Sequence, residues 1–226
     1  MKMLSGRKSK YWYLSHFSLS KRLNNKDLQY FCNNSIMRNY VKGDRIYYND
    51  GFDDHIYFLK KGSLSISKVQ ESGNELMIGL VKQRSIFGIS KLLNSSKSAD
   101  YEVAIALESC IICMVHSKIL MELMEKNESL NNYILKLAGF QIKRLENRLE
   151  DVIFKSSEER IREFLTKFIK NFGVNLGAYI EADLMLTNKN IAKLTNTTRQ
   201  KVNVVMNLMR KERIIEYDKK KLRLLN

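Results

Sequence analysis

The sequence of 226 residues contains no proline, one tryptophan, three histidines and three cysteines. Without proline, its turns must be formed by Gly, Asn, Asp and Ser. The odd number of cysteines and the lack of a recognisable signal peptide argue against a disulfide-stabilised secreted protein and favour the cytoplasm. No apolar run approaches the length of a membrane span, because the longest one, Cys110 to Val115, has the size of a strand.

The common signatures of catalysis and of metal binding are also missing. The sequence has no Ser/His/Asp set, no metal-ligand spacing and no GxxxxGK phosphate loop, so we expect neither an enzyme nor a metal site. Cys110 and Cys113 have CxxC spacing, but they lie in a predicted strand. Residues three apart on a strand point to opposite faces and cannot readily hold one metal ion, so buried thiols are expected.

Positive charge is abundant, and it is concentrated at the two ends of the chain. The formal net charge is +15, and residues 185–226 carry 11 basic against 3 acidic side chains. Residues 1–23 carry 6 basic and no acidic side chains, whereas the region between is near neutral. Segregated charge of this kind indicates a polyanionic partner for the C-terminal part. Residues 1–20 are expected to form a basic, solvated arm.

Residues 40–115 show the pattern of short strands separated by turns that contain Gly, Asn and Asp. A short helix over residues 21–35, with Leu23, Leu28 and Phe31 on its apolar side, is predicted to precede them. Strands are expected at residues 46–48, 56–59, 64–67, 76–81 and 85–88, with two more between 102 and 115. Regularly spaced short strands predict a β-sandwich or jelly roll.

From Ser117 the apolar residues are spaced three or four apart for roughly 35 residues, which predicts a helix about 50 Å long. Such a helix is too long to bury its apolar stripe against one small β domain, so we expect it to pair with its copy in a dimer. Packing on its own chain is the alternative. The residues expected at the dimer seam are Leu130, Ile134, Leu137, Gln141 and Leu145.

The C-terminal region has the start and stop signals of a helix-turn-helix. Ser156, followed by Glu158 and Glu159, predicts a new helix after a boundary at Lys155. Further on, Thr187 and Thr198 are suitable N-caps for two helices, and Asn196 falls at the sharp turn between them. Ile214 and Ile215 precede a basic segment at residues 218–221, and Leu222 and Leu224 follow it. This pattern predicts two short strands joined by a basic turn, that is, a wing.

The exposed face of the second helix is expected to enter the major groove of double-stranded DNA. Gln200 and Asn203 have the amide geometry for adenine, and Val204 can touch a thymine methyl group. The expected base contacts are Gln200, Asn203, Val204 and Asn207. The expected phosphate contacts are Thr187, Lys193, Thr198, Arg199, Lys201, Lys219 and Lys220. A helical hairpin for protein contacts and an RNA-binding surface are the alternatives, and the latter would favour more exposed aromatic residues.

The order of these elements resembles the Crp/Fnr family of bacterial transcription regulators. The resemblance rests on Lys42-Gly43-Asp44, Ile56 to Leu59 with Gly62, the hairpin at Gly73, Phe87-Gly88, and Leu186 to Met209. It implies an α+β fold with an N-terminal jelly-roll (β-roll) sensor domain over residues 21–116, a long dimerisation helix over 117–154, and a winged helix-turn-helix over 155–226. It also implies a homodimer that binds DNA and contacts RNA polymerase. No association with a membrane is expected.

The sequence departs from the family members that bind cyclic AMP. In those members, Glu after Phe-Gly and a later Arg with Ser or Thr hold the nucleotide. Here the corresponding effector pocket would be formed by Phe87, Gly88, Ile89, Ser90, Lys97 and Ser98, so that Glu and Arg are both missing. Cyclic AMP is therefore disfavoured, because Lys lacks the bidentate fork of Arg. An unidentified effector, or none, is expected.

Other effectors and a different operator can also be judged from the sequence. Residues 1–31 lack the cysteines of the family's iron–sulfur sensors, and His55 and His116 are expected to be surface or hinge residues rather than haem ligands. Gln200 and Val204 replace the Glu and Arg that read guanine–cytosine pairs in other members, which leads to the hypothesis of an operator richer in A·T pairs. A cyclic-nucleotide-responsive regulator and a protein-interaction subunit with an incidental basic surface remain alternatives.

Overall fold

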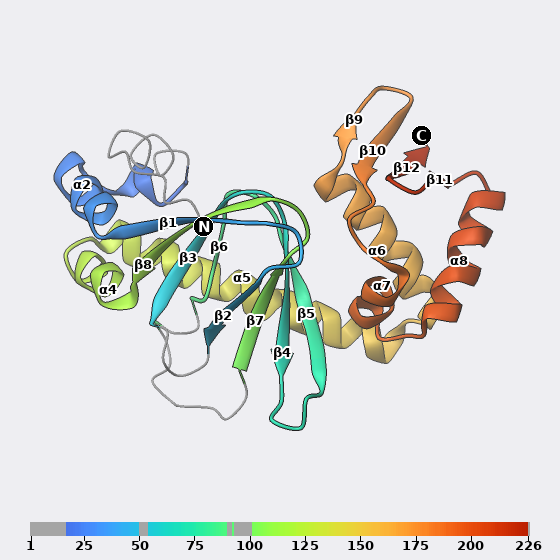
Figure 1. Cartoon of the computed structure of the whole chain (residues 1–226), viewed down its shortest axis with the longest axis horizontal. Helices are drawn as coiled ribbons and strands as arrows, with labels where there is room; N and C mark the ends of the chain where they lie inside the picture. Colours follow the sequence, from blue (N-terminus) through green and yellow to red (C-terminus); the bar gives the residue numbers. More distant parts are fainter. Residues whose placement is uncertain (1–16, 50–53, 90–91, 93–100, 226) are drawn as a thin grey trace. The chain divides into compact units, whose positions relative to one another are not determined.

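A computed structural model of the chain describes residues 17–49, 54–89, 92 and 101–225. It divides into two compact units, Met1–Lys143 and Arg144–Asn226, and each unit has its own buried apolar residues. Strands dominate the first unit and helices the second, so the fold class is α+β, as predicted (Figure 1). None of the helices in the described ranges combines the length and the apolar composition that a bilayer crossing requires.

The described strands of the first unit form two four-stranded sheets, and neighbouring strands within each sheet are antiparallel. One sheet has the order β1 (Ser35–Tyr40), β8 (Cys110–His116), β3 (His55–Lys61) and β6 (Ser85–Phe87). The other has the order β2 (Arg45–Asn49), β7 (Tyr101–Ala106), β4 (Leu64–Val69) and β5 (Glu75–Val81). The predicted β-roll is thus confirmed, and the predicted turns at Gly43, Gly62 and Gly73 have positive φ angles.

Two apolar clusters stabilise the β-roll, one on each face of the sheet that contains β3 and β8. Residues of β3, β6 and β8 pack against residues of β2, β4, β5 and β7 in the interior between the sheets, and Tyr57 stacks on Phe87 there with ring centroids 4.9 Å apart. On the opposite face, Ile56 and Phe58 pack against the helices. Cys110 belongs to the first cluster and Cys113 to the second. The prediction that these cysteines point to opposite faces as buried thiols is therefore confirmed, and burial raises the pKa of Cys110 to about 11.

Among the described residues, the helices that begin in the first unit are η1 (Ser20–Arg22), which is a 3-10 helix, α2 (Asn25–Asn33), α4 (Ser117–Glu125) and α5 (Glu128–Phe154), and α5 continues into the second unit. The predicted helix over residues 21–35 exists as η1 and α2, with Leu23, Leu28 and Phe31 buried as expected. Strand β1 was missing from the prediction because its alternation of buried and exposed residues begins directly after the helix. The predicted N-terminal arm lies largely outside the described residues.

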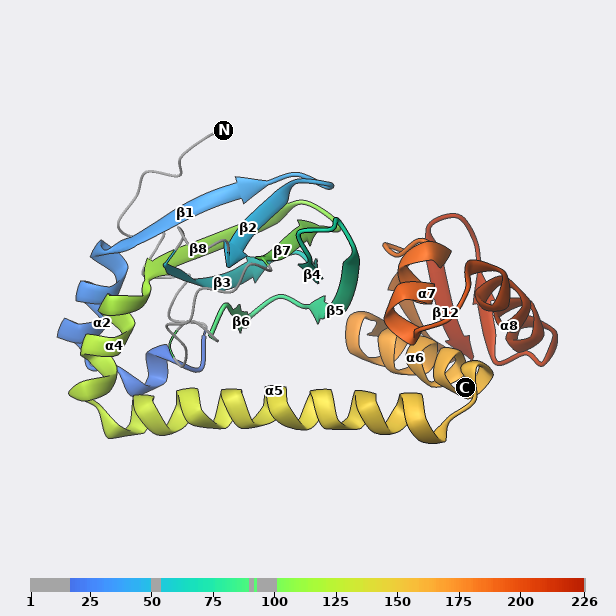
Figure 2. The ribbon, with the colours of Figure 1, turned by 90° about the horizontal axis from the view of Figure 1, so that it is seen from below.

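The long helix is not continuous, which corrects the prediction of a single helix from Ser117 onwards. It breaks at Lys126–Asn127, where the Leu130 N–H donates to Asn127 Oδ1 at 3.0 Å and Asn127 Nδ2 donates to the Arg22 carbonyl at 2.6 Å. Asn127 therefore caps α5, so the two helices are separate elements. The second piece, α5, still has 27 residues, and Figure 2 shows it from the side along its whole length.

The predicted dimer seam is also wrong in its first half. Leu130 and Ile134 are fully buried in the core of their own β-roll, and Leu137 packs against the same cluster. Gln141 follows on the same side of the helix and is half-buried. Only Leu145 is exposed, at 53 %. Helix α5 has one apolar stripe that its own chain buries and a second, described below, that remains exposed. The spacing of apolar residues in the sequence does not distinguish the two.

After the end of α5, the second unit contains the helices α6 (Ser157–Phe172), α7 (Asn188–Thr195) and α8 (Arg199–Lys211) and a small sheet. The sheet has the order β11 (Ile215–Tyr217), β12 (Lys221–Leu225), β10 (Tyr179–Asp183) and β9 (Val174–Asn175). The predicted wing, β11 with β12, is confirmed, but it is joined to two strands that the sequence analysis missed. Ser156 caps α6 as predicted, and with Glu159 it forms a capping box.

Candidate nucleic-acid interface

Helix α7 begins at the predicted cap, Thr187. The Asn190 N–H donates to Thr187 Oγ1 at 3.2 Å, and the Thr187 N–H donates back to Asn190 Oδ1 at 3.0 Å. Ile191 and Ala192 are buried, and Leu194 is half-buried. The Thr187 hydroxyl also donates to Asn190 Oδ1 at 2.5 Å, so its proton is used within the cap and is not available for the predicted phosphate contact.

The turn between α7 and α8 has the geometry that the sequence predicted. Asn196 adopts φ 51° and ψ 58°, in the left-handed region that Asn tolerates better than most residues. Thr198 then caps α8, because its side chain accepts a hydrogen bond from the Lys201 N–H at 3.2 Å. These local signals fix the angle at which α8 leaves the turn.

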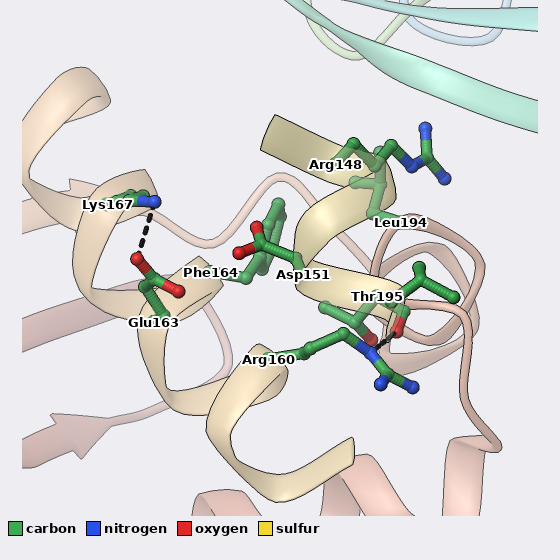
Figure 3. Close-up of a pocket in the computed structure, with 9 residues that line it drawn as sticks. Arg148, Asp151, Arg160, Glu163, Phe164, Lys167, Leu194 and Thr195 are labelled. Carbon is green, nitrogen blue, oxygen red and sulfur yellow. Dashed lines mark hydrogen bonds and ion pairs between the residues drawn. The ribbon is translucent and has the colours of Figure 1, made fainter. Parts of the chain in front are cut away.

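An arginine of α6, which the sequence analysis did not single out, holds this turn in place. Arg160 donates from Nε to the Thr195 carbonyl at 3.0 Å (Figure 3). Its Nη2 donates to the Asn196 carbonyl at 3.1 Å. Its Nη1 donates to the carbonyl of Lys155 at 2.6 Å, just before α6 begins. A cation therefore satisfies carbonyls at the C-terminal end of α7 that have no partner within that helix.

Arg160 lines a small pocket together with residues from the end of α5, α6 and α7 (Figure 3). Its volume is about 110 Å³, well below the roughly 300 Å³ at which small-molecule pockets begin. Lys155 forms ion pairs with Asp151 of α5 and Glu163 of α6, and Lys167 also binds Glu163. The two lysines hold the pKa of Glu163 below its usual range. The pocket is thus too small for an effector, and the charged residues around it connect neighbouring helices through ion pairs.

We predict that Arg160→Ala loosens α7 specifically. Losing three hydrogen bonds from a charged donor should raise amide exchange in α7 by roughly 30-fold, equivalent to about 2 kcal/mol. Arg160→Lys should not restore protection, because one ammonium group cannot serve carbonyls that lie apart. Hydrogen–deuterium exchange on the full chain measures this, with Arg199→Ala as the control at an exposed position. Equal α7 protection in both variants would contradict the role of Arg160.

The face of α8 predicted to read DNA is exposed, and the opposite face is buried. Val202, Val205, Met206 and Met209 are at most 2 % exposed. Gln200, Asn203, Val204 and Asn207 are all exposed, as is Arg199. Arg162 of α6 forms ion pairs with Glu158 of its own helix and with Glu212, the residue that directly follows α8, so it ties the end of α8 to α6. Helix α8 is therefore amphipathic, and the face that is exposed is the one that the sequence predicted to be exposed.

The basic residues of this unit differ in how far they are neutralised. Lys221 pairs with Glu181 at 3.2 Å and with Asp183 at 2.9 Å, and Arg223 pairs with Glu181 at 2.7 Å. These two cations hold the pKa of Glu181 below its usual range. Lys201 lies 3.7 Å from the Glu158 carboxylate, which weakens its predicted role at a phosphate. The charge that a phosphate would meet is thus smaller than the sequence count suggests.

The turn at the tip of the wing, between β11 and β12, presents exposed lysines. Asp218 folds the turn by accepting from the backbone N–H groups of Lys220 at 2.7 Å and Lys221 at 2.9 Å. Those bonds lower the pKa of Asp218, so it stays ionised and holds the turn at neutral pH. Lys219 and Lys220 are both exposed at the tip, and Lys193 lies half-buried in the last turn of α7.

The predicted effector pocket can be placed only in part. Phe87 and Ile89 are each 2 % exposed and belong to the two apolar clusters on opposite faces of their sheet. Gly88 lies between them with φ 80°. Ser90, Lys97 and Ser98 lie outside the described residues. His116 caps α4 through Nδ1, which accepts from the Lys118 N–H at 3.3 Å, and its ring contacts that of His55.

Comparisons with known proteins agree with this architecture. Residues 37–127 match the family model of a cyclic nucleotide-binding domain, and residues 159–226 match that of a Crp-like helix-turn-helix domain. The global nitrogen regulator of Nostoc sp. is 25% identical over 187 residues, which are 83% of this chain and 84% of that protein. The anaerobic regulatory protein of Bacillus subtilis is 20% identical over 76% of this chain and 72% of that protein.

The fold itself has solved counterparts. The structure of FixK2 from Bradyrhizobium japonicum superposes with a TM-score of 0.72 at 15% identity, covering 85% of this chain and 92% of that one. The chain belongs to the Crp/Fnr family of transcription regulators, and its helix-turn-helix is a DNA-binding domain. These relatives are transcription regulators, which are not enzymes.

Proposed function

We propose that the protein acts as a homodimer that binds a pseudo-palindromic DNA site, with one α8 helix in each of two successive major grooves. The observation that carries this proposal is the exposed face of α8, where Gln200, Asn203, Val204 and Asn207 lie opposite a fully buried side. Two half-sites about 34 Å apart, one helical turn of DNA, would match a two-fold symmetric dimer. Arg199, Lys193 and the wing lysines would contact phosphates.

An exposed stripe on α5 supports the dimer. Large apolar residues repeat at heptad spacing along it and remain exposed, namely Leu135, Ile142, Leu145, Leu149 and Val152. Alternating steps of three, four and seven residues are typical of a helix that pairs with another helix. A row of large apolar side chains that each remain 38 to 62 % exposed on a single chain indicates an interface. A second copy of α5 offers the same stripe in return.

We further propose that the β-roll does not use cyclic AMP and takes another effector or none. In place of the carboxylate that holds a ribose, the chain has Ile89, which is buried among apolar residues. An isoleucine offers no hydrogen-bonding group to a sugar hydroxyl. The protein would act in the cytoplasm, would contact RNA polymerase as a family trait, and would have no catalytic activity.

Salt dependence tests the DNA-binding surface. Purified protein should bind duplexes selected from a random pool, and its affinity should fall steeply as salt rises, because each phosphate contact releases counterions. Changing Lys219 and Lys220 together to Ala should flatten the plot of log affinity against log salt by about one unit for each phosphate that is no longer neutralised. Fluorescence anisotropy measures both effects, with Lys82→Ala in the β-roll as the control.

Adding cyclic AMP to the same titration should change nothing. Binding that requires the nucleotide would contradict the proposal for the β-roll. Affinity that is equal at low and high salt would instead favour a regulatory subunit that works through a protein partner.

A further inference from the structure

Two asparagines on the exposed face of α8 have their amide oxygens engaged within the protein. Tyr217 Oη donates to Asn207 Oδ1 at 2.9 Å, and Asn188 Nδ2 donates to Asn203 Oδ1. The two donors come from different elements, since Asn188 is the first residue of α7 and Tyr217 is the last residue of β11 in the wing. Each asparagine thus has a neighbour outside its own helix.

The donors are themselves held in place. The Arg210 guanidinium lies over the Tyr217 ring, 5.6 Å from its centroid, and Tyr217 is paired with Leu222 in the wing sheet. Asn188 follows the Thr187 cap directly, in the first turn of α7. Neither donor therefore sits on a long, flexible side chain, so each amide oxygen of α8 meets a donor whose backbone is fixed by a helix cap or a strand pair.

The orientation of an asparagine amide decides what it can read. Oxygen and nitrogen diverge from the same carbon, so an oxygen turned toward a protein donor leaves the NH₂ group directed elsewhere. We infer that Asn188 and Tyr217 are positioning residues that make Asn203 and Asn207 present N–H donors to DNA. The inference rests on the proposed function, because it assumes that this face of α8 enters the major groove.

This polarity changes the base that fits. Adenine is read by an amide that donates to N7 and accepts from the N6 amino group at the same time, whereas guanine offers two acceptors, N7 and O6. An amide restricted to donating fits guanine better than adenine, so Asn203 should favour guanine. This differs from the prediction that Asn203 reads adenine. Any preference for A·T pairs would then come from Gln200 and Val204, and Asn207 would donate to a base acceptor or a phosphate oxygen.

The free protein provides the first test, which needs no DNA. The side-chain carbonyl carbon of an asparagine is deshielded when its oxygen accepts a hydrogen bond. In carbon-13 NMR spectra of the full chain, this resonance should move upfield for Asn203 in Asn188→Ala and for Asn207 in Tyr217→Phe. The control Tyr179→Phe removes a hydroxyl from another strand of the same sheet and should move neither. Unchanged resonances in Asn188→Ala and Tyr217→Phe would overturn the inference.

The second test reverses the polarity at one position. In Asn188→Asp the new carboxylate can only accept, so Asn203 must turn its NH₂ group toward it and present its oxygen to the groove. Selection from a random pool of duplex DNA should then replace guanine by adenine or cytosine at one position of each half-site, with a change in preference of about tenfold. Lys189→Gln is the matched control, because it lowers the local charge equally at an exposed neighbour.

The outcomes separate the two proposals. A guanine preference that is lost in Asn188→Asp and kept in Lys189→Gln supports the inference. The same selected sequence in all three proteins overturns it and leaves DNA binding intact. If the wild type selects no sequence while the NMR resonances move as expected, the positioning role of Asn188 and Tyr217 is supported and the proposed DNA-binding face is what fails.

Discussion

Leu145→Glu is expected to leave the protein monomeric and to abolish specific DNA binding. Leu145 lies 53 % exposed in the apolar stripe of α5, and both copies would bury it in a dimer. Burying a leucine contributes about 1.5–3 kcal/mol, so losing two of them and introducing two carboxylates should raise the dissociation constant of the dimer at least about hundredfold. Sedimentation velocity across a concentration series measures it, and anisotropy with a two-half-site duplex shows the loss of binding.

Phe140→Glu is the control for this experiment. Phe140 is even more exposed, at 72 %, but it falls outside the heptad positions of the stripe, on the side of α5 that would face solvent in a helix pair. It should leave the mass of the dimer unchanged. Ile134→Ala should lower the free energy of unfolding without affecting dimer mass, because Ile134 is buried in its own β-roll. A dimeric Leu145→Glu, or a monomeric Phe140→Glu, would contradict the interface.

Gly62→Ala should destabilise the β-roll severely. Gly62 has φ +91°, and a Cβ atom there would lie 2.6 Å from Cys110 Sγ and 2.7 Å from the Ser109 carbonyl oxygen. The clash is with backbone and with a buried thiol, so it cannot be relieved by a small rotation. Together with the strain of positive φ, the cost should exceed about 3 kcal/mol.

Gly43→Ala separates strain from clash. Gly43 has nearly the same φ, +94°, but nothing lies within 4 Å of its Cβ position. It should cost only about 1 kcal/mol, which is the conformational part alone. Urea unfolding of the full chain, followed by circular dichroism, compares the two variants. Equal midpoints would show that the approach of Gly62 to Cys110 does not matter for stability.

The elements with local signals were predictable from the sequence. Thr187, Thr198 and Asn196 act through hydrogen bonds and backbone angles within a few residues of themselves, and all three have the predicted roles. The alternation that placed Cys110 and Cys113 on opposite faces is equally local. Capping and strand periodicity depend on short-range geometry, so a single sequence contains them.

The features that were missed depend on contacts between distant residues. Leu130 and Ile134 have the same spacing as a dimer seam, and only the position of the β-roll shows that they are buried by their own chain. Arg160 reaches carbonyls 35 and 36 residues away, and Tyr217 reaches an amide of α8 from the wing. Nothing in the residues adjacent to them in the sequence indicates such partners. The orientation of an amide is likewise a property of the fold and not of the residue type.

The double use of α5 has a kinetic consequence. Leu130 and Ile134 fix the first turns of this helix to its own β-roll, so in the proposed dimer part of the pairing surface would be ordered before a second chain arrives. Association would then resemble the docking of preformed surfaces and would not have to include the folding of a disordered segment. Newly made chains should pair quickly at low cellular abundance, and partners should exchange between dimers without unfolding.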